Sequence, residues 1–94
     1  MLKIQLEELE IFITVVDSGN FSKAAEVLAI TSSVVSRTIK KLENKLTTTL
    51  FNRTTRKVYL TQEGEWLYNN AYEMIVQANN IESYLSDKQR APKG

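Results

Sequence analysis

The stretch from Thr31 to Lys45 is rich in hydroxyl and cationic side chains and contains a single acid, Glu43. Hydroxyl groups donate and accept hydrogen bonds, and cations attract anions, so these residue types suit reversible binding of a polyanion. The side chains that could make such bonds are Thr31, Ser32, Ser33, Ser36, Arg37, Lys40 and Lys41. Apolar residues recur among them at steps of four, three and four: Val35, Ile39, Leu42 and Leu46. The spacing predicts a helix that buries its apolar face and exposes the hydroxyls and cations.

The chain has few side chains that could form a site for covalent catalysis. The sequence contains no cysteine and no histidine, which excludes disulfides, thiolate metal sites and nucleophile–base pairs that need either residue. No pair of carboxylates is apparent that would share a pocket. We therefore expect no metal and no cofactor, and an enzyme is the least favoured class.

The charge is polarised along the chain. Residues 31–60 hold seven cations against Glu43 alone, a net charge of +6, although the whole chain carries only +1. Residues 1–30 hold two cations and five acids, and residues 61–94 hold three cations and five acids, which gives −3 and −2. A cationic middle third is a candidate footprint for a polyanion. The alternative is an ordinary solvated face, and the coincidence with the helical pattern favours the footprint.

A shorter helix is predicted directly before Thr31, with Ser22 as its capping residue. Its apolar face consists of Ala24, Ala25, Val27 and Leu28. The small side chains of Ala24 and Ala25 allow two helices to cross closely, as a helix-turn-helix requires, and Thr31 is the predicted cap of the second helix. Residues 21–45 therefore form either a solvated helical hairpin or a helix pair that places a recognition helix in a DNA groove.

One helix and one hairpin are predicted to frame this pair. A helix over about residues 5–17 precedes it and ends at Gly19, with this apolar stripe: Leu6, Leu9, Phe12, Ile13 and Val16. Two β-prone runs flank a polar turn over about residues 50–60 and predict a small hairpin with Arg53, Arg56 and Lys57 at its tip. Cations at such a tip suit phosphates or a minor groove, and the alternative is that they pair with local acids.

The last predicted helix is long for a domain of 94 residues. It runs from a cap at Thr61 to about Ser86, and Gly64 lies where a side chain could clash with the rest of the domain. Its apolar seam follows a heptad: Leu67, Ala71, Met74, Ala78, Ile81 and Leu85. A seam of this length predicts a twofold dimer, although its first turns could instead fold over the first helix. Residues 87–94 are predicted to be a flexible polar tail.

The whole chain is predicted to be mainly α: a winged helix-turn-helix over residues 1–60, with a three-helix core and a small β-hairpin wing, followed by a dimerisation helix over residues 61–86. No window is long and apolar enough for a membrane span, and glutamates interrupt the apolar N-terminus where a signal peptide would need an unbroken run. A cytoplasmic protein without membrane contact is the expectation.

In this order the elements resemble the N-terminal DNA-binding domain of LysR-type transcriptional regulators. The resemblance covers about residues 5–86 and rests on three blocks: LEELEIFITVVDSGNFSKAAEVLAIT, SSVVSRTIKKLENKL and LFNRTTRKVYLTQEG. It implies a bacterial transcription factor that binds double-stranded DNA at an interrupted inverted repeat. It also implies a homodimer through the last helix. A full-length form could in addition assemble into a higher oligomer. The family's effector-binding domain is absent from these residues.

Position by position, the resemblance implies DNA contacts from the recognition helix and the wing. The implied residues are Thr31, Ser32, Ser33, Ser36, Arg37, Arg53 and Arg56. We expect Ser36 and Arg37 to read base edges, and Lys40, Lys41 and Lys45 to supply screening charge. Three residues depart from the family: Ser32 replaces glutamine or proline, Val34 replaces alanine, and Thr47 replaces the glycine after the recognition helix.

An interaction protein is the alternative class. A short chain of this kind could pair through its last helix with a full-length regulator and modulate it. Mixed dimers with weak binding to DNA alone would favour this alternative.

Overall fold

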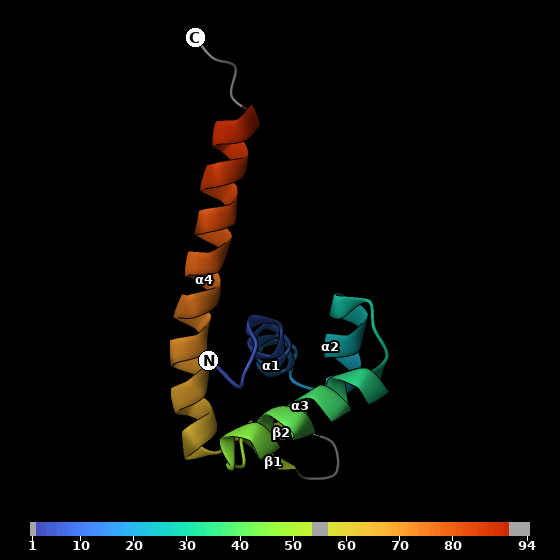
Figure 1. The fold of residues 1–94 in the computed structure, drawn as a ribbon. Coiled ribbons are helices and arrows are strands. Elements are labelled where there is room, and N and C mark those ends of the chain that lie inside the picture. Colours follow the sequence, from blue (N-terminus) through green and yellow to red (C-terminus); the bar gives the residue numbers. More distant parts are fainter. Residues whose placement is uncertain (1, 54–56, 91–94) are drawn as a thin grey trace.

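The computed structural model describes residues 2–53 and 57–90, which form four helices and one two-stranded antiparallel sheet (Figure 1). In chain order the elements are α1 (Leu6–Ser18), α2 (Phe21–Leu28), α3 (Ser32–Leu46), β1 (Phe51–Arg53), β2 (Val58–Leu60) and α4 (Gln62–Arg90). The first three helices and the hairpin form a body, and the second half of α4 projects away from it. The predicted mainly helical, winged architecture is confirmed.

Helix α1 begins and ends with side-chain and backbone caps that its sequence provides. The carboxylate of Glu8 accepts the backbone N–H of Gln5 at 2.8 Å, which satisfies one of the amides left unpaired at a helix start. Gly19 ends the helix in the left-handed region, with φ of 88°, as predicted. The predicted stripe is wrong at Leu6, whose side chain is 44% exposed because it precedes the part of α1 that the body covers.

Helix α2 starts one residue earlier than its predicted cap. Asn20, not Ser22, caps it by accepting the backbone N–H of Lys23 at 2.7 Å. Ala24 and Ala25 are buried, so the close crossing that their size allows is present. Val27 was predicted on the buried face but is 65% exposed, because the short helix turns only its alanine side fully inward.

Helix α3 crosses under α1 and buries Val35, Ile39 and Leu42 completely. Thr31 caps it as predicted, accepting the backbone N–H of Val34 at 3.2 Å. Leu46 was predicted to be buried but is 36% exposed, since it lies at the last turn, where the helix leaves the core. Thr47 then adopts the left-handed conformation, with φ of 53°, at the position where the resemblance implied a glycine.

The hairpin is held against α3 by the single acid of the cationic third. The strands pair antiparallel, with Phe51 opposite Leu60 and Arg53 opposite Val58. The carboxylate of Glu43 on α3 accepts the backbone N–H of Leu50 at 2.8 Å, directly before β1. Glu43 therefore positions the wing relative to α3.

One apolar core joins the helices to the hairpin. Its largest fully buried side chains are Phe12, Leu9, Ile39, Leu42, Leu50, Val15 and Val35. The ring of Phe51 on β1 lies 5.4 Å from that of Phe12 and 6.1 Å from that of Phe21, so aromatic contacts connect the wing to α1 and α2.

Helix α4 is fixed to the body only over its first turns. The hydroxyl of Thr61 accepts the backbone N–H of Gly64 at 3.0 Å, which is the predicted cap. Ala71 is fully buried, and Leu67 and Ile75 pack against the core. The helix continues to Arg90, so the tail predicted from residue 87 is helical over its first four residues. The molecule is therefore 58 Å long but only 29 Å and 20 Å across.

Candidate nucleic-acid interface

The polar face of α3 lies on the surface of the body. Thr31, Ser32, Ser33, Arg37 and Lys40 are exposed, and Ser36 is half-buried. The opposite face of the same helix is held rigidly by the core, because Val35, Ile39 and Leu42 have no exposed surface. The sequence-predicted hydroxyls and cations of α3 are thus brought together on one fixed, solvent-facing surface, which we call the α3 face (Thr31, Ser32, Ser33, Ser36, Arg37 and Lys40).

The side chain of Lys41 belongs to a different side of α3. It lines a cleft of about 330 Å³ together with Glu7, Glu8 and Glu10 of α1. Val34 lines the same cleft and is 37% exposed. Lys41 is exposed and shares this cleft with the three glutamates, and Val34 lines the cleft on the α1 side of α3.

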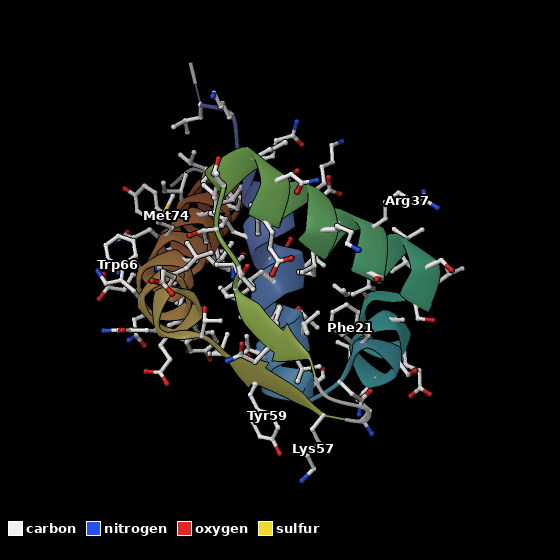
Figure 2. All side chains as sticks on the ribbon, turned by 90° about the horizontal axis from the view of Figure 1, so that it is seen from below. Phe21, Arg37, Lys57, Tyr59, Trp66 and Met74 are labelled. Atoms are coloured by element: carbon white, nitrogen blue, oxygen red, sulfur yellow. The ribbon has the colours of Figure 1, made fainter. Side chains whose placement is uncertain are left out.

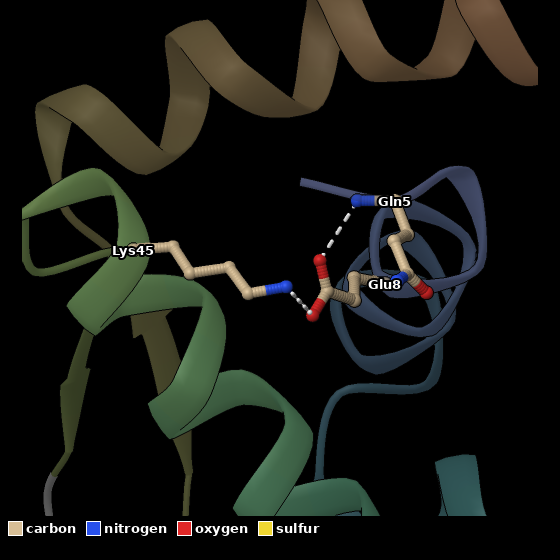
Figure 3. A network of polar contacts seen from close by, with 3 residues as sticks. All are labelled: Gln5, Glu8 and Lys45. Carbon is tan, nitrogen blue, oxygen red and sulfur yellow. Dashed lines mark hydrogen bonds and ion pairs between the residues drawn. The ribbon is translucent and has the colours of Figure 1, made fainter. Parts of the chain in front are cut away.

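Lys45 is neutralised by a buried acid. Its ammonium Nζ lies 2.7 Å from Oε2 of Glu8, and the two side chains are 22% and 8% exposed (Figure 3). Burial alone would raise the pKa of Glu8, but the bonds from Lys45 and from the Gln5 amide outweigh burial, so the pKa lies below its ordinary value. This cation therefore ties the end of α3 to the start of α1, and its expected role as screening charge for a ligand stays a prediction.

The hairpin contributes a second exposed region. Lys57 on the hairpin and Tyr59 of β2 are exposed, and Figure 2 shows Lys57 and Arg37 both pointing away from the core from different elements. Arg56 lies outside the described residues, and Arg53 is described only as part of the β1 backbone. The positions predicted for the wing arginines thus stay predictions.

The residues predicted for a dimer interface divide into two groups. Ala71 has no exposed surface, so it cannot contact a second copy, and Leu67 is half-buried against the same core. Met74, Ile81 and Leu85 are 47%, 58% and 52% exposed, and Ala78 is half-buried. Leu67 and Ala71, the first two residues of the predicted seam, therefore belong to the protomer's own core and not to an exposed dimer surface.

Leu6 was not predicted to lie beside the exposed apolar side of α4. Leu6 of α1 joins Met74, Ala78 and Ile81 in an open groove of about 710 Å³ along α4. Its exposure, which contradicts the predicted core stripe, is what places it there. The signal was weak, because an apolar residue at a helix start looks like any other core position.

Within the described residues, no cluster of three or more acidic side chains is arranged to hold a metal ion. Nor does any described helix combine the length and the hydropathy that crossing a membrane requires. The exposed side chains suit reversible binding: hydroxyls and cations on α3 and the hairpin, and apolar groups on α4.

Proteins with similar sequences are bacterial transcription regulators. The family model described as "Bacterial regulatory helix-turn-helix protein, lysR family" matches residues 6–65. The regulator CrgA of Neisseria meningitidis is 42% identical over 93 residues, which are 99% of this chain and 31% of the relative. The activator TtdR of Escherichia coli is 36% identical over 88 residues, 94% of this chain and 28% of the relative. The chain thus spans about a third of the length of these curated relatives.

Solved structures of similar fold include protein–DNA complexes. The DNA-binding domain of BenM in complex with catB site 1 DNA has a TM-score of 0.88 at 30% identity, covering 96% of this chain and all of that one. The structure of CrgA has a TM-score of 0.79 at 42% identity, covering 98% of this chain and 31% of that one.

Proposed function

The chain belongs to the LysR family of bacterial regulatory helix-turn-helix proteins, and from this premise we propose that it binds double-stranded DNA sequence-specifically as a homodimer. Helix α3 enters the major groove of each half of an interrupted inverted repeat. The hairpin contacts the backbone or the adjacent minor groove. The observation that carries the proposal is the exposed hydroxyl and cationic α3 face on a helix whose other side is locked into the core.

Charge and shape both support DNA as the ligand. The net charge of +6 over residues 31–60 matches a polyanion, while the acids of residues 1–30 would repel one. The similar fold of the BenM domain is solved on DNA, with a TM-score of 0.88. A helix needs a groove about 12 Å wide, which the major groove of B-DNA provides.

Different parts of the α3 face have different roles in this proposal. Arg37 reads guanine edges through its planar fork of donors, and Ser36 contacts a neighbouring base. The hydroxyls of Thr31 and Ser33 lie at the start of α3, where a helix N-terminus favours anions, and they bind phosphates. Lys40 adds screening charge. Lys41 contributes less, because its cleft on the α1 side contains three glutamates.

The wing is assigned to the phosphate backbone. Lys57 is exposed on the hairpin, and the family resemblance adds Arg53 and Arg56. A backbone contact holds the protein in register but carries no sequence information by itself. The wing therefore sets affinity, and α3 sets discrimination.

The dimer is assigned to the exposed side of α4. The groove beside Met74 and Ile81 offers an apolar surface that the body does not cover. Two copies related by a twofold axis would each present one α3, which matches the symmetry of an inverted repeat.

The test is fluorescence anisotropy with an inverted-repeat duplex and a scrambled duplex of equal length over a range of salt concentrations. Arg37→Ala should lower the preference for the repeat by roughly 5- to 150-fold for each half-site, because a bidentate base contact contributes about 1–3 kcal/mol of discrimination. Arg53→Ala should weaken both duplexes similarly and reduce the salt slope by about 0.9 per protomer, or about 1.8 for the dimer.

Lys23→Ala is the matched control, because it removes an exposed cation of α2 outside the proposed interface. It should leave affinity and discrimination unchanged. If Arg37→Ala and Arg53→Ala behaved like Lys23→Ala, the interface would be misassigned.

A further inference from the structure

A hydrogen bond joins α4 to α1 across 51 residues of sequence. The hydroxyl of Tyr68 donates to Oδ1 of Asp17 at 2.6 Å. The carboxylate raises the pKa of Tyr68 to about 12, because the hydrogen bond requires the phenol proton and the negative charge opposes a phenolate. The ring of Tyr68 also stacks on that of Tyr72, with centroids 6.0 Å apart. Tyr68 is thus held from two sides.

The other contacts of α4 with the body are hydrogen bonds at its start and apolar packing along one side. Thr61, directly before the helix, donates its hydroxyl to the Thr49 carbonyl at 2.7 Å, and this pins one point. Beyond it, Leu67 and Ala71 pack through apolar surface, which resists separation but is non-directional. The Tyr68 hydroxyl lies seven residues after Thr61, about 10 Å along the axis at 1.5 Å per residue. Two fixed points determine the direction of a rigid helix.

Small changes in this direction have large effects at the far end of α4. A helix of 29 residues is about 43 Å long at 1.5 Å per residue. A rotation of about 10° at its start therefore moves its end by roughly 7 Å, which corresponds to about two base pairs along DNA. In a dimer joined through α4, the angle between α4 and the body sets the distance between the two α3 helices.

We propose that the Tyr68–Asp17 hydrogen bond is a positioning contact that selects the spacing between the two DNA half-sites. The inference rests on the proposed function, since it needs a dimer joined through α4 and DNA bound by α3. Tyr68 and Asp17 touch no DNA in this arrangement. They act through the angle of α4 and leave the reading of each half-site to α3.

The test measures affinity for a set of duplexes in which the two half-sites move apart in steps of one base pair. The wild-type chain should show a clear optimum. Tyr68→Phe keeps the ring and removes only the hydroxyl, so it should flatten the profile, with the preference for the best spacing over its neighbours reduced about threefold or more. Asp17→Ala removes the acceptor from α1 and should give the same flattened profile.

Two further variants serve as controls. Tyr72→Phe removes a hydroxyl one turn further along α4 that makes no hydrogen bond within the described part of the chain, and it should keep the wild-type profile. Asp17→Asn keeps an acceptor oxygen and should largely restore the preference. Affinity for a duplex with a single half-site should be the same for all five proteins.

Three results would overturn the proposal. An unchanged spacing profile for both Tyr68→Phe and Asp17→Ala means that apolar packing alone sets the angle. Reduced affinity for the single half-site, with the spacing optimum retained, means that the bond only supports the body. Absence of binding by the wild-type chain to any duplex contradicts the proposed function itself and removes the premise of the positioning role.

Discussion

The pair of Glu8 and Lys45 connects residues 37 positions apart and joins the start of α1 to the end of α3 (Figure 3). Glu8 has two roles at once, since one carboxylate oxygen caps α1 and the other binds the ammonium. A carboxylate bound by a cation and an amide is stabilised in its charged form. The cost of removing one partner is large, because the other charge would be left buried.

Glu8→Gln should lower the free energy of unfolding at pH 7 by about 1–3 kcal/mol, since it leaves the Lys45 ammonium without its counter-charge. The folded-state pKa of Glu8 lies below the ordinary 4.5, so its stabilising contribution is present above pH 4.5 and is lost as pH falls through the folded pKa. The difference between wild type and variant should therefore shrink in acid. Denaturation in urea at pH 7 and at pH 3 measures both effects.

Glu10→Gln is the control, because it neutralises an exposed acid two positions along the same helix. It should change stability by less than about 0.5 kcal/mol. A Glu8→Gln variant as stable as wild type at pH 7 would contradict the role assigned to the pair.

Pairings of this kind could not be predicted from the sequence. The polarised charge is visible in a count of residues, but Glu8 is one of three glutamates at the start of α1, and Lys45 is one of several cations on α3. Only the crossing angle of the two helices decides which of them meet. The same holds for Tyr68 and Asp17, which no local pattern connects.

At the scale of elements, α3 ends in a conformation that its sequence does not favour. Thr47 occupies the left-handed region, with φ of 53°, where a β-branched side chain is crowded. The amides of Thr47 and Thr48 nevertheless cap the helix through the carbonyls of Asn44 and Glu43. The departure from glycine is therefore accommodated as backbone strain, and the turn keeps its geometry.

Thr47→Gly should raise the free energy of unfolding by about 0.5–1 kcal/mol, because relief of the left-handed strain exceeds the added freedom of the unfolded chain. Thr48→Gly is the control, since Thr48 is not among the described residues with positive φ, and it should be neutral or destabilising. Thermal unfolding distinguishes the two. Destabilisation by Thr47→Gly would mean that the threonine side chain contributes contacts that outweigh its strain.

At Gly64 the prediction from the sequence is confirmed: a side chain at this position would clash with the rest of the domain. A Cβ at this position would collide with the carbonyl oxygen of Leu50 and lie 2.8 Å from the side chain of Leu60. Since one of these neighbours is backbone, the start of α4 would have to move away from the hairpin. Close approach, and not a turn, explains this glycine.

Gly64→Ala should destabilise the fold by up to about 2 kcal/mol. Alanine favours a helix over glycine by about 1 kcal/mol, and overpacking costs about 1–3 kcal/mol, so the collision outweighs the helical preference. Ser83→Ala, at an exposed position of α4, should be neutral or slightly stabilising. An increase in melting temperature for Gly64→Ala would show that α4 can shift without cost.

The elements themselves were predictable because their apolar residues repeat with helical or strand periods. Errors arose where two similar signals compete or where an element ends. Asn20 and Ser22 are both good caps, and only the path of the turn selects Asn20. Leu6 and Leu46 fit the apolar period of α1 and α3 but lie where each helix leaves the core.

The whole molecule consists of a body and a long helix, α4, whose second half extends away from it. Helix α4 continues past Ile75, which still packs against the core, to Arg90, and its exposed half carries apolar side chains that a single protomer leaves in water. The heptad predicted this surface only in part, because its first members belong to the protomer's own core. The groove with Leu6 marks the side on which we place the partner.

Ile81→Asp should weaken self-association at least tenfold, because it puts a charge in the centre of the proposed apolar contact. Asn79→Asp introduces the same charge two residues earlier, about 200° around the helix, and should leave association unchanged. Sedimentation equilibrium measures both. Equal dissociation constants for the two variants would place the dimer contact elsewhere on the surface.

Selection of duplexes from a random pool, by the purified chain and by its Arg37→Ala variant, tests whether α3 reads DNA. We predict that the chain enriches an interrupted inverted repeat, and that Arg37→Ala loses the preference at one position in each half while keeping the spacing. Recovery of no repeat, or of the same repeat with the same preferences by both proteins, would contradict the account that α3 reads DNA through Arg37.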